Sequence, residues 1–317
     1  MSLYLVTGGA GFIGSNIVEE LLKRGEKVRI LDNFSTGKRE TITELKQIAD
    51  SLFQSQSNLE VIEGDIRSYH IVREAVDEVD YILHQAALPS VPRSVKDPIT
   101  SNEVNVTGTL NILNAAKDAK VQRIVYASSS SVYGDLDVLP KTEDMLPKPL
   151  SPYAVSKLAG EKYCQVFTQL YGLETVSLRY FNVFGPRQDP TSQYSAVIPK
   201  FINLIKQGES PTIYGDGEQS RDFTFVQNVV EANLLACNDG IENFSGEVFN
   251  IAFGKRISVN NMVEKINEVL SKNIVPKYDQ PRSGDVKHSL ANIGKAQQFL
   301  EYKPTIDFEA GLRRIID

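Results

Sequence analysis

The chain has 317 residues, 41% of them hydrophobic and 23% charged, which excludes a disordered chain and allows one large or two ordinary domains. Its 34 Lys and Arg against 40 Asp and Glu give a net charge of −6, which argues against nucleic acid or an anionic membrane as a partner. Two cysteines and three histidines, scattered along the chain, exclude a disulfide framework and disfavour a metal site. We expect a cytoplasmic protein with no membrane span, no cleaved signal and no bound metal.

Short apolar runs alternate with helical patterns over the first 180 residues. The runs that predict strands are 3–6, 28–31, 59–62, 81–83, 124–126 and 175–178. Apolar residues at helical spacing lie between several of these runs, as in the segments that begin at Ile13 and Thr109. This alternation predicts an α/β fold built on a doubly wound parallel sheet of the Rossmann type.

The pattern is looser after about residue 180, where Gly and Pro cluster at 185–186, 215–217 and 280–284. Helical spacing recurs over 196–205, 226–236 and 260–270, and the run 248–251 predicts a strand that rejoins the main sheet. We therefore expect two domains, 1–180 with the Rossmann sheet and 181–317 as a smaller mixed α/β domain.

A glycine-rich loop follows the first predicted strand. Glycines at positions 8, 11 and 14 match G-x-x-G-x-x-G, and an amphipathic helix begins within the loop. Side chains at these positions would hold the backbone away from a pyrophosphate, and the helix N-terminus offers unpaired N–H groups to the anion. The predicted contacts of a bound dinucleotide are Gly8, Gly11, Phe12, Ile13 and Gly14.

An acidic residue ends the second predicted strand. Asp32 lies 18 residues after Gly14, close to the spacing of about 20 that is usual for dinucleotide sites. A carboxylate there accepts hydrogen bonds from a ribose and repels a 2′-phosphate, so NAD is favoured over NADP. Asp65 follows the third strand and can accept from an adenine amino group, whereas His84 is interpreted as packed at a strand end rather than catalytic.

Proton-transfer chemistry is indicated by a second motif. Tyr153 and Lys157 form Y-x-x-x-K behind a helix start at 151–152, so both side chains share one helix face. A nearby ammonium is expected to lower the tyrosine pKa toward neutrality, where a general acid or base works best. The serine run 128–131 follows the fifth strand and can bridge a substrate oxygen to Tyr153. The non-functional alternatives are that Y-x-x-x-K is part of a solvated helix face and that the serine run forms an ordinary turn.

Taken together, the motifs resemble the extended short-chain dehydrogenase/reductase family, and most closely its UDP-N-acetylglucosamine 4-epimerases. The segments that carry this resemblance are 7–14, 32–33, 64–66, 84–87, 105, 128–131, 153–157, 179–182, 220–222 and 282–285. The resemblance implies NAD as the cofactor. It implies cofactor contacts, besides the glycine loop, at Asp32, Asn33, Asp65, Ile66, Gln85, Ala86, Ala87, Asn105, Tyr153 and Lys157.

The same resemblance implies a UDP-sugar substrate lying across the two domains. Arg221 and Arg282 would clamp the diphosphate with guanidinium donors, Asp285 would accept from the ribose, and Tyr214 would lie against the uracil. Ser129 occupies the position of the family's catalytic hydroxyl. The implied substrate contacts are Ser90, Arg93, Ser129, Ser130, Asn182, Val197, Tyr214, Arg221, Arg282, Asp285 and Ser289.

Two features of the sequence favour one reaction within the family. The serine run carries no carboxylate, whereas related dehydratases and decarboxylases carry acidic residues there. Ser289 stands where epimerases confined to UDP-glucose and UDP-galactose often have a bulky tyrosine, so it leaves volume for an N-acetyl group. The stretch 90–94 also resembles the acetamido-sugar branch.

The predicted activity is reversible C4 epimerisation of UDP-N-acetylglucosamine and UDP-N-acetylgalactosamine through a transient 4-keto sugar, with UDP-glucose and UDP-galactose as further substrates. The alternatives are an epimerase for UDP-glucose alone, another NAD-dependent dehydratase, decarboxylase or oxidoreductase, and a non-catalytic NAD sensor. The resemblance also implies a homodimer formed through residues around 100–116 and 157–170.

Overall fold

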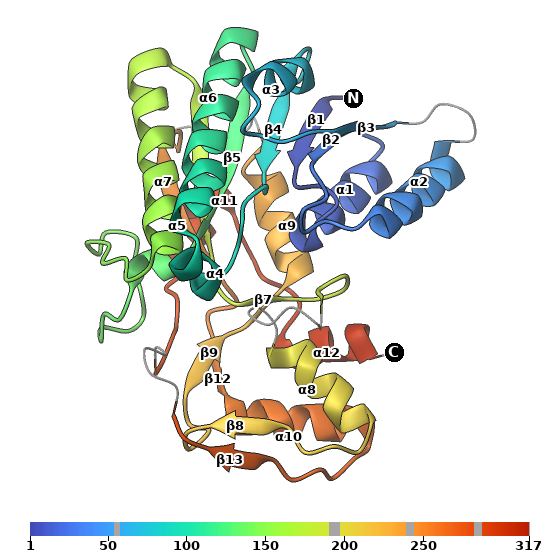
Figure 1. Ribbon diagram of the computed structural model, residues 1–317, viewed down its shortest axis with the longest axis vertical. Helices are drawn as coiled ribbons and strands as arrows, with labels where there is room; N and C mark the ends of the chain where they lie inside the picture. The colour runs from blue at the N-terminus through green and yellow to red at the C-terminus, as the bar shows by residue number, and fades with distance from the viewer. Residues whose placement is uncertain (54–57, 190–196, 239–243, 282–286, 317) are drawn as a thin grey trace.

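Seven parallel strands form the central sheet of the computed structural model, which describes residues 1–53, 58–189, 197–238, 244–281 and 287–316 (Figure 1). The strands lie in the order β11-β6-β5-β4-β1-β2-β3, and every neighbouring pair is parallel. Their bounds are β1 Leu3–Thr7, β2 Lys27–Asp32, β3 Leu59–Glu63, β4 Tyr81–His84, β5 Arg123–Ser129, β6 Glu174–Tyr180 and β11 Glu247–Ile251. From β1 the chain first adds β2 and β3 on one side and then β4, β5, β6 and β11 on the other. The strand order therefore reverses between β1 and β4, and sheets of this kind bind ligands in the crevice at the carboxyl ends of these two strands.

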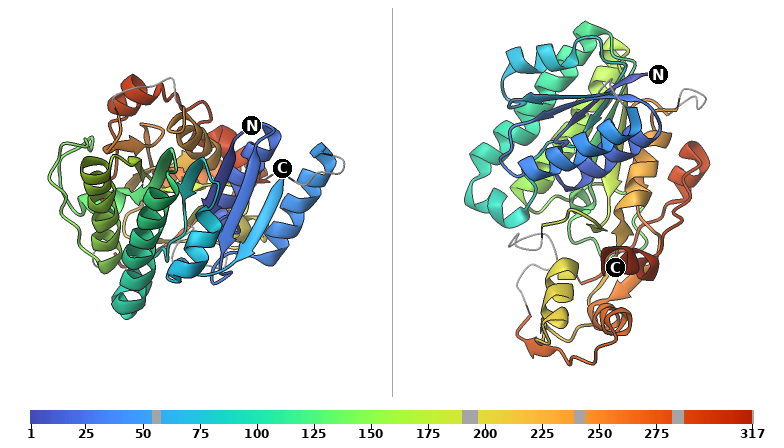
Figure 2. Two further views of the ribbon diagram at one scale, coloured as in Figure 1. Left: turned by 90° about the horizontal axis from the view of Figure 1, so that it is seen from above. Right: turned by 90° about the vertical axis from the view of Figure 1, so that its right-hand side faces the viewer.

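Helices cover both faces of the sheet (Figure 2). One face carries α1 Phe12–Lys23, α2 Arg39–Phe53 and α9 Val226–Leu235; the other carries α3 Tyr69–Val76, α6 Gly108–Ala119 and α7 Pro152–Tyr171. Successive residues of β1 explain this arrangement. Leu5 packs in one buried cluster with Val72 of α3, and Val6 packs in the other with Ile17 of α1. Alternating side chains of one strand thus bury both layers.

Short elements fill the connection between β4 and β5. They are α4 Val91–Lys96, α5 Pro98–Asn102 and the π-helical turn η1 Glu103–Thr107, which runs directly into α6. Ser90 is the N-cap of α4, and Asp97 is the N-cap of α5. The side chain of each cap accepts a hydrogen bond from a backbone N–H in the first turn of its helix. Both short helices pack against α7. The 3-10 turn η2 Ser130–Tyr133 follows β5.

The second half of the chain forms a smaller region below the sheet in Figure 1. It contains α8 Val197–Lys206, α10 Val259–Leu270 and α12 Phe308–Ile316, while α11 Gly294–Leu300 lies against β11. Three two-stranded sheets join them: β7 Val183–Phe184 with β10 Thr224–Phe225, β8 Thr212–Tyr214 with β13 Lys277–Asp279, and β9 Ser220–Asp222 with β12 Arg256–Ser258. Only the β9–β12 pair among these is antiparallel in the described parts of the chain.

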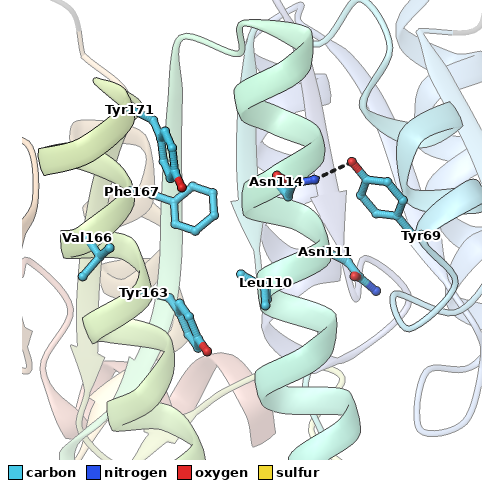
Figure 3. Close-up of a pocket in the computed structure, with 8 residues that line it drawn as sticks. All are labelled: Tyr69, Leu110, Asn111, Asn114, Tyr163, Val166, Phe167 and Tyr171. Atoms are coloured by element: carbon cyan, nitrogen blue, oxygen red, sulfur yellow. Dashed lines mark hydrogen bonds between the residues drawn. The ribbon is translucent and has the colours of Figure 1, made fainter.

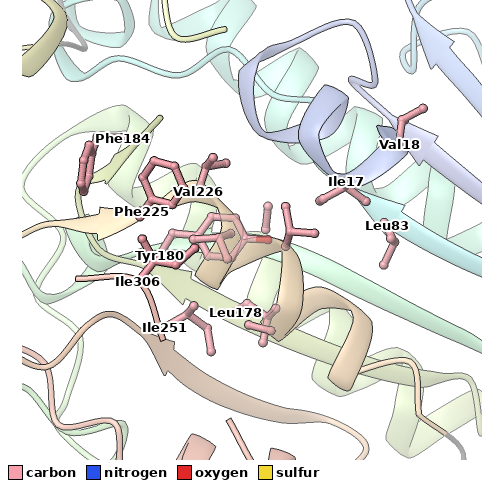
Figure 4. Packing of buried hydrophobic residues seen from close by; sticks show 14 of the residues in the cluster. Ile17, Val18, Leu83, Leu178, Tyr180, Phe184, Phe225, Val226, Ile251 and Ile306 are labelled. Atoms are coloured by element: carbon pink, nitrogen blue, oxygen red, sulfur yellow. The ribbon is translucent and has the colours of Figure 1, made fainter. Parts of the chain in front are cut away.

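One apolar cluster connects the two regions. Tyr180 at the end of β6 packs with Phe225 and Val226 from the second half, and the same cluster continues to Ile17 of α1 (Figure 4). The predicted fold class is confirmed, including the strand over 248–251, which pairs with β6 as β11. Helix α9 also returns to pack against α1. The division at residue 180 stays a prediction.

No helix in the described ranges is both long enough and apolar enough to cross a bilayer.

Candidate active site

The glycine loop between β1 and α1 has the close packing that a pyrophosphate cradle requires. Gly8 has φ of +70°, and a Cβ there would lie 2.8 Å from the backbone nitrogen of Ala86. A Cβ at Gly14 would overlap the carbonyl oxygen of Gly8, which also accepts a 3.0 Å hydrogen bond from the Gly11 nitrogen. The loop therefore turns tightly into the N-terminus of α1 at Phe12 and Ile13, which suits a phosphate group.

Asp32 joins this loop to the end of β2. Its carboxylate is buried and accepts hydrogen bonds from the nitrogens of Ala10 at 2.9 Å and Phe34 at 2.8 Å. Burial raises the pKa of Asp32, and the two main-chain donors oppose that rise. Asp32 is therefore held at the carboxyl edge of the sheet, where the sequence predicts a ribose contact.

Asp65 lies beside Asp32 on the neighbouring strand end. The amide of Asn33 donates to it at 2.8 Å, and Arg67 makes a 2.8 Å ion pair with it. The hydrogen bond from Arg67 lowers the pKa of Asp65 to about 2, so it is ionised at neutral pH. Ile66 is buried next to Gly108 of α6. The loop and these acidic residues fit NAD, because they combine a backbone cradle with carboxylate acceptors.

The end of β4 completes this crevice. His84 is fully buried between the hydroxyls of Thr7, at 2.6 Å, and Thr109, at 3.0 Å. Burial lowers its pKa to about 3, so it is neutral, which confirms that it is a packed histidine. The Thr7 hydroxyl also accepts a hydrogen bond from the nitrogen of Ala86 at 3.2 Å, which holds the segment of Ala86 and Ala87 against β1.

Two side-chain amides fix the segment that follows β4. Gln85 donates to Asn233 of α9 at 3.0 Å and accepts from the Tyr180 hydroxyl at 3.2 Å. Asn105 of η1 bonds both backbone groups of Leu88, accepting at 2.8 Å and donating at 3.2 Å. Its amide also donates to Ser156 of α7 at 3.0 Å. Asn105 therefore links the predicted cofactor crevice to the helix of Tyr153 and Lys157.

Helix α7 begins as the sequence predicts. Ser151 caps it, with its hydroxyl accepting from the nitrogen of Ala154 at 3.1 Å, and Pro152 is the first helical residue. Lys157 lies one turn beyond Tyr153 and is buried. Its Nζ donates to the carbonyl of Ala127 on β5 at 2.9 Å, and burial lowers its pKa to about 8.

Ser129 at the end of β5 lies close enough to the phenol of Tyr153 to affect its pKa, so the structure brings these two predicted catalytic residues together. Burial raises the pKa of Tyr153, and the side chain of Ser129 opposes the rise. In the protein without bound cofactor or substrate, the expectation that Lys157 lowers the pKa of Tyr153 is wrong. Burial of the phenol is the largest influence on this pKa, and the Lys157 ammonium, which bonds to Ala127, is not among the groups that lower it.

The serines that precede η2 have separate roles. Ser128 is buried and donates to Glu161 at 2.5 Å, and Glu161 forms a buried ion pair with Arg179 at 2.8 Å. The hydroxyl of Ser129 accepts a hydrogen bond from the nitrogen of Ser131 at 3.2 Å, and the same side chain lowers the pKa of the Tyr153 phenol. Ser129 is thus the member of the run that reaches the tyrosine.

Comparison with known proteins places this arrangement in a family. Residues 4–252 match the family model described as the NAD dependent epimerase/dehydratase family. The chain belongs to this family. Its enzymes use NAD, and the membership confirms the resemblance and the cofactor predicted from the motifs.

Three relatives match over nearly the whole chain. The first is the structure of the UDP-N-acetylglucosamine 4-epimerase from Methanobrevibacter ruminantium in complex with UDP-N-acetylmuramic acid, with 43% identity, a TM-score of 0.91, and coverage of 99% of this chain and 97% of that one. The second is a UDP-glucose 4-epimerase of Thermus thermophilus in complex with NAD, with 36% identity, a TM-score of 0.85, and the same coverage. The third is a UDP-glucuronate 4-epimerase of Thermodesulfobacterium geofontis, 33% identical, with 100% of this chain and 96% of the relative covered.

In this family member, residues from the second half meet at the ends of β6 and β9. Asn182 has φ of +36° and donates to the hydroxyl of Ser289 at 3.2 Å and to the carbonyl of Asp222 at 3.3 Å. Arg221 donates to the carbonyls of Ser220 at 3.0 Å and Lys287 at 3.2 Å. Three predicted substrate residues, Asn182, Arg221 and Ser289, are therefore brought together.

The other predicted substrate residues are more dispersed. The hydroxyl of Ser90 accepts from the Arg93 nitrogen at 3.2 Å, and Arg93 is exposed on α4. Val197 begins α8, and Tyr214 ends β8. Ser130 begins η2 and is partly buried. Arg282 and Asp285 lie outside the described residues.

The sequence analysis did not identify several residues that hold the candidate site in place. Asp222 is buried, with both carboxylate oxygens 3.2 Å from the nitrogen of Gly254 and one of them 3.2 Å from that of Ala291. Burial raises its pKa to about 7. The sequence offers one signal for it, because Asp222 belongs to the segment 220–222 that carries the family resemblance. Asn233 and Glu161 carry no such signal, since their partners lie far away in the chain.

Proposed function

We propose that this UDP-sugar 4-epimerase interconverts UDP-N-acetylglucosamine and UDP-N-acetylgalactosamine, and that it also accepts UDP-glucose and UDP-galactose. The observation that carries the sugar assignment is the contact between Ser289 and Asn182. A serine is small, so we infer that a bulky side chain at position 289 would crowd the sugar next to Asn182, the predicted sugar-binding residue. The 43% identity to a protein named UDP-N-acetylglucosamine 4-epimerase supports the same substrate.

The proposed chemistry divides between cofactor and protein. NAD, when bound, accepts the hydride from C4 of the sugar and returns it. Tyr153 takes the proton from the sugar O4 and gives it back, and the neighbouring hydroxyl of Ser129 relays it. Lys157, one turn along α7 from Tyr153 and bonded to Ala127, is the proposed source of the positive charge that an ionised Tyr153 requires. The 4-keto sugar turns about its diphosphate between the two transfers, which inverts C4.

Epimerisation is favoured over elimination or decarboxylation by the polar groups near Tyr153. Ser129 ends β5 and Ser130 begins η2, and the carboxylate of Glu161 is paired with Arg179. Both oxygens of Glu161 accept hydrogen bonds from Arg179, and one of them also accepts from Ser128, so this carboxylate is already engaged. The intact Tyr153–Ser129 pair likewise argues against a mere NAD sensor, which needs no general base. A cytoplasmic location and UDP-sugars as the partners remain predictions.

Replacing Ser289 with tyrosine should abolish turnover of UDP-N-acetylglucosamine and preserve most turnover of UDP-glucose, because the phenol occupies the volume assigned to the acetamido group. The measurement is the ratio of kcat/KM for the two substrates, which we expect to fall by roughly 100-fold or more. Ser289→Ala is the matched control and should leave the ratio near its original value. Equal losses on both sugars would contradict the assignment of Ser289. Turnover of UDP-glucuronate alone in the wild-type protein would contradict the proposed substrate.

We also propose a homodimer formed through the outer faces of α6 and α7. These helices border a groove whose lining is shared with α3 (Figure 3). Figure 3 shows Leu110 of α6 facing Tyr163 and Phe167 of α7. Along the outer face of α7, Val155, Val166 and Leu170 are 41–68% exposed. A second copy would cover this stripe by packing two helices against two, as in a four-helix bundle.

The variant Leu170→Glu should shift the protein from dimer to monomer, because an isologous interface places the new charge in contact with its own copy or with apolar residues. Light scattering during gel filtration measures the mass. Leu52→Glu on α2, where Leu52 is 46% exposed, is the matched control and should stay dimeric. A monomeric wild-type protein at micromolar concentration would rule out this interface.

A further inference from the structure

The start of helix α7 leaves one backbone N–H that its own cap does not bind. Pro152 has no N–H, the Ala154 nitrogen donates to the Ser151 hydroxyl at 3.1 Å, and the Val155 nitrogen donates to the Ser151 carbonyl at 2.9 Å. The remaining donor in this turn is the nitrogen of Tyr153. Its partner comes from a different element, because it donates to the hydroxyl of Ser94 at 3.0 Å.

Ser94 is held rigidly on α4. It is fully buried, and its hydroxyl donates in turn to the carbonyl of Val91 at 2.7 Å. The single hydroxyl therefore acts both as acceptor from α7 and as donor within α4. Since Tyr153 is the donor, the bond fixes the backbone of the residue whose side chain reaches Ser129.

The segment that carries Ser94 is anchored on both sides. On one side, Asn105 bonds both backbone groups of Leu88 and also reaches Ser156 on α7. On the other side, Asp97 begins α5, which packs against α7. Ser94 is thus the contact in the middle of a clamp that joins the β4–α5 connection to the first turns of α7.

We propose that Ser94 is a positioning residue, which sets the placement of Tyr153 through its backbone N–H and so the rate of proton transfer. This inference rests on the proposed role of Tyr153. Without the Ser94 hydroxyl, the first turn of α7 loses its tie to α4, and the phenol is free to move relative to Ser129. A displacement of about 1 Å in a reacting group lowers a rate by roughly 10²-fold.

The test compares Ser94→Ala with Ser101→Ala in the full-length enzyme carrying its cofactor. Ser101 is a matched control, because it is also buried in a neighbouring short helix and donates to a carbonyl, that of Asp97, at 2.8 Å. Its hydroxyl bonds within its own helix rather than to Tyr153, so its loss removes a comparable group without touching the proposed tie. We expect Ser94→Ala to lower kcat by roughly 10- to 100-fold at nearly unchanged KM and NAD content, and Ser101→Ala to leave kcat within about twofold.

A double-mutant cycle separates positioning from general loss of structure. If Ser94 acts through Tyr153, Ser94→Ala should add no further loss in a Tyr153→Phe background. The inference would be overturned if Ser94→Ala lowered kcat by the same factor in the Tyr153→Phe background as in the wild type. An unchanged kcat in Ser94→Ala, or an equal fall in Ser101→Ala, would also overturn it. Its failure is distinct from failure of the proposed function, in which the wild-type protein itself would not epimerise a UDP-sugar.

Discussion

Tyr153→Phe is expected to lower kcat by roughly 10²- to 10⁴-fold while NAD remains bound, because the change removes the hydroxyl that exchanges the O4 proton and keeps the ring. The geometry supports a specific effect. The Tyr153 hydroxyl is the group that Ser129 influences, whereas the backbone of Tyr153 is held by Ser94 and should not move. Steady-state turnover of the UDP-sugar and the NAD released on denaturation measure the two outcomes.

The control for this variant is Tyr171→Phe on the same helix, where the side chain is 54% exposed. It removes an identical hydroxyl and should leave kcat unchanged. Activity of Tyr153→Phe within a few-fold of wild type would assign the proton transfer to another group. Loss of NAD together with activity would indicate a cofactor-binding role instead.

Gly14→Ala is expected to empty the cofactor site. The added Cβ overlaps the Gly8 carbonyl oxygen, a backbone atom that cannot move away alone, so the loop must open. Overpacking of this kind costs about 1–3 kcal/mol in stability. Because we assign the same loop to the pyrophosphate, we also expect NAD affinity to fall by roughly 100-fold, measured by titration of the cofactor-free protein.

Two further glycines provide controls of graded severity. A Cβ at Gly11 would lie 3.2 Å from the same oxygen, so Gly11→Ala should have a small effect. A Cβ at Gly311 of α12 would lie 2.6 Å from the ring of Phe225, far from the loop. Gly311→Ala should therefore reduce thermal stability but not NAD affinity. Equal NAD affinity in Gly14→Ala and wild type would contradict the assignment of the loop.

The strands of the main sheet could be predicted because each contains a short apolar run, which is buried on both faces in β4, β5 and β6 and only partly buried in the edge strand β3. The end of β5 was harder to predict. The predicted run 124–126 becomes Arg123–Ser129, since Ser128 and Ser129 continue the pairing with β6. Burial of the polar Ser128 depends on Glu161, which lies 33 residues away. A local pattern carries no information about such a distant partner.

The positions of candidate site residues were easiest to predict where a motif requires one particular residue type. Gly8, Gly14, Asp32 and the Tyr153–Ser129 pair all appear where the motifs place them. The direction of the Tyr153 pKa shift was predicted wrongly, because helical spacing does not show that the phenol is buried, and burial raises its pKa. The contact of Ser94 with α7 was likewise invisible, since it depends on how a six-residue helix packs.

The most direct test of the central claim uses UDP-N-acetylglucosamine carrying deuterium at C4. The purified protein, with no NAD added, is incubated with this substrate in ordinary water, and the product is examined by NMR. We predict UDP-N-acetylgalactosamine that retains deuterium at C4, because the hydrogen removed from the sugar is returned to the same carbon without exchange with solvent. A product with protium at C4, or the absence of any C4-inverted product after NAD is supplied, would contradict the account.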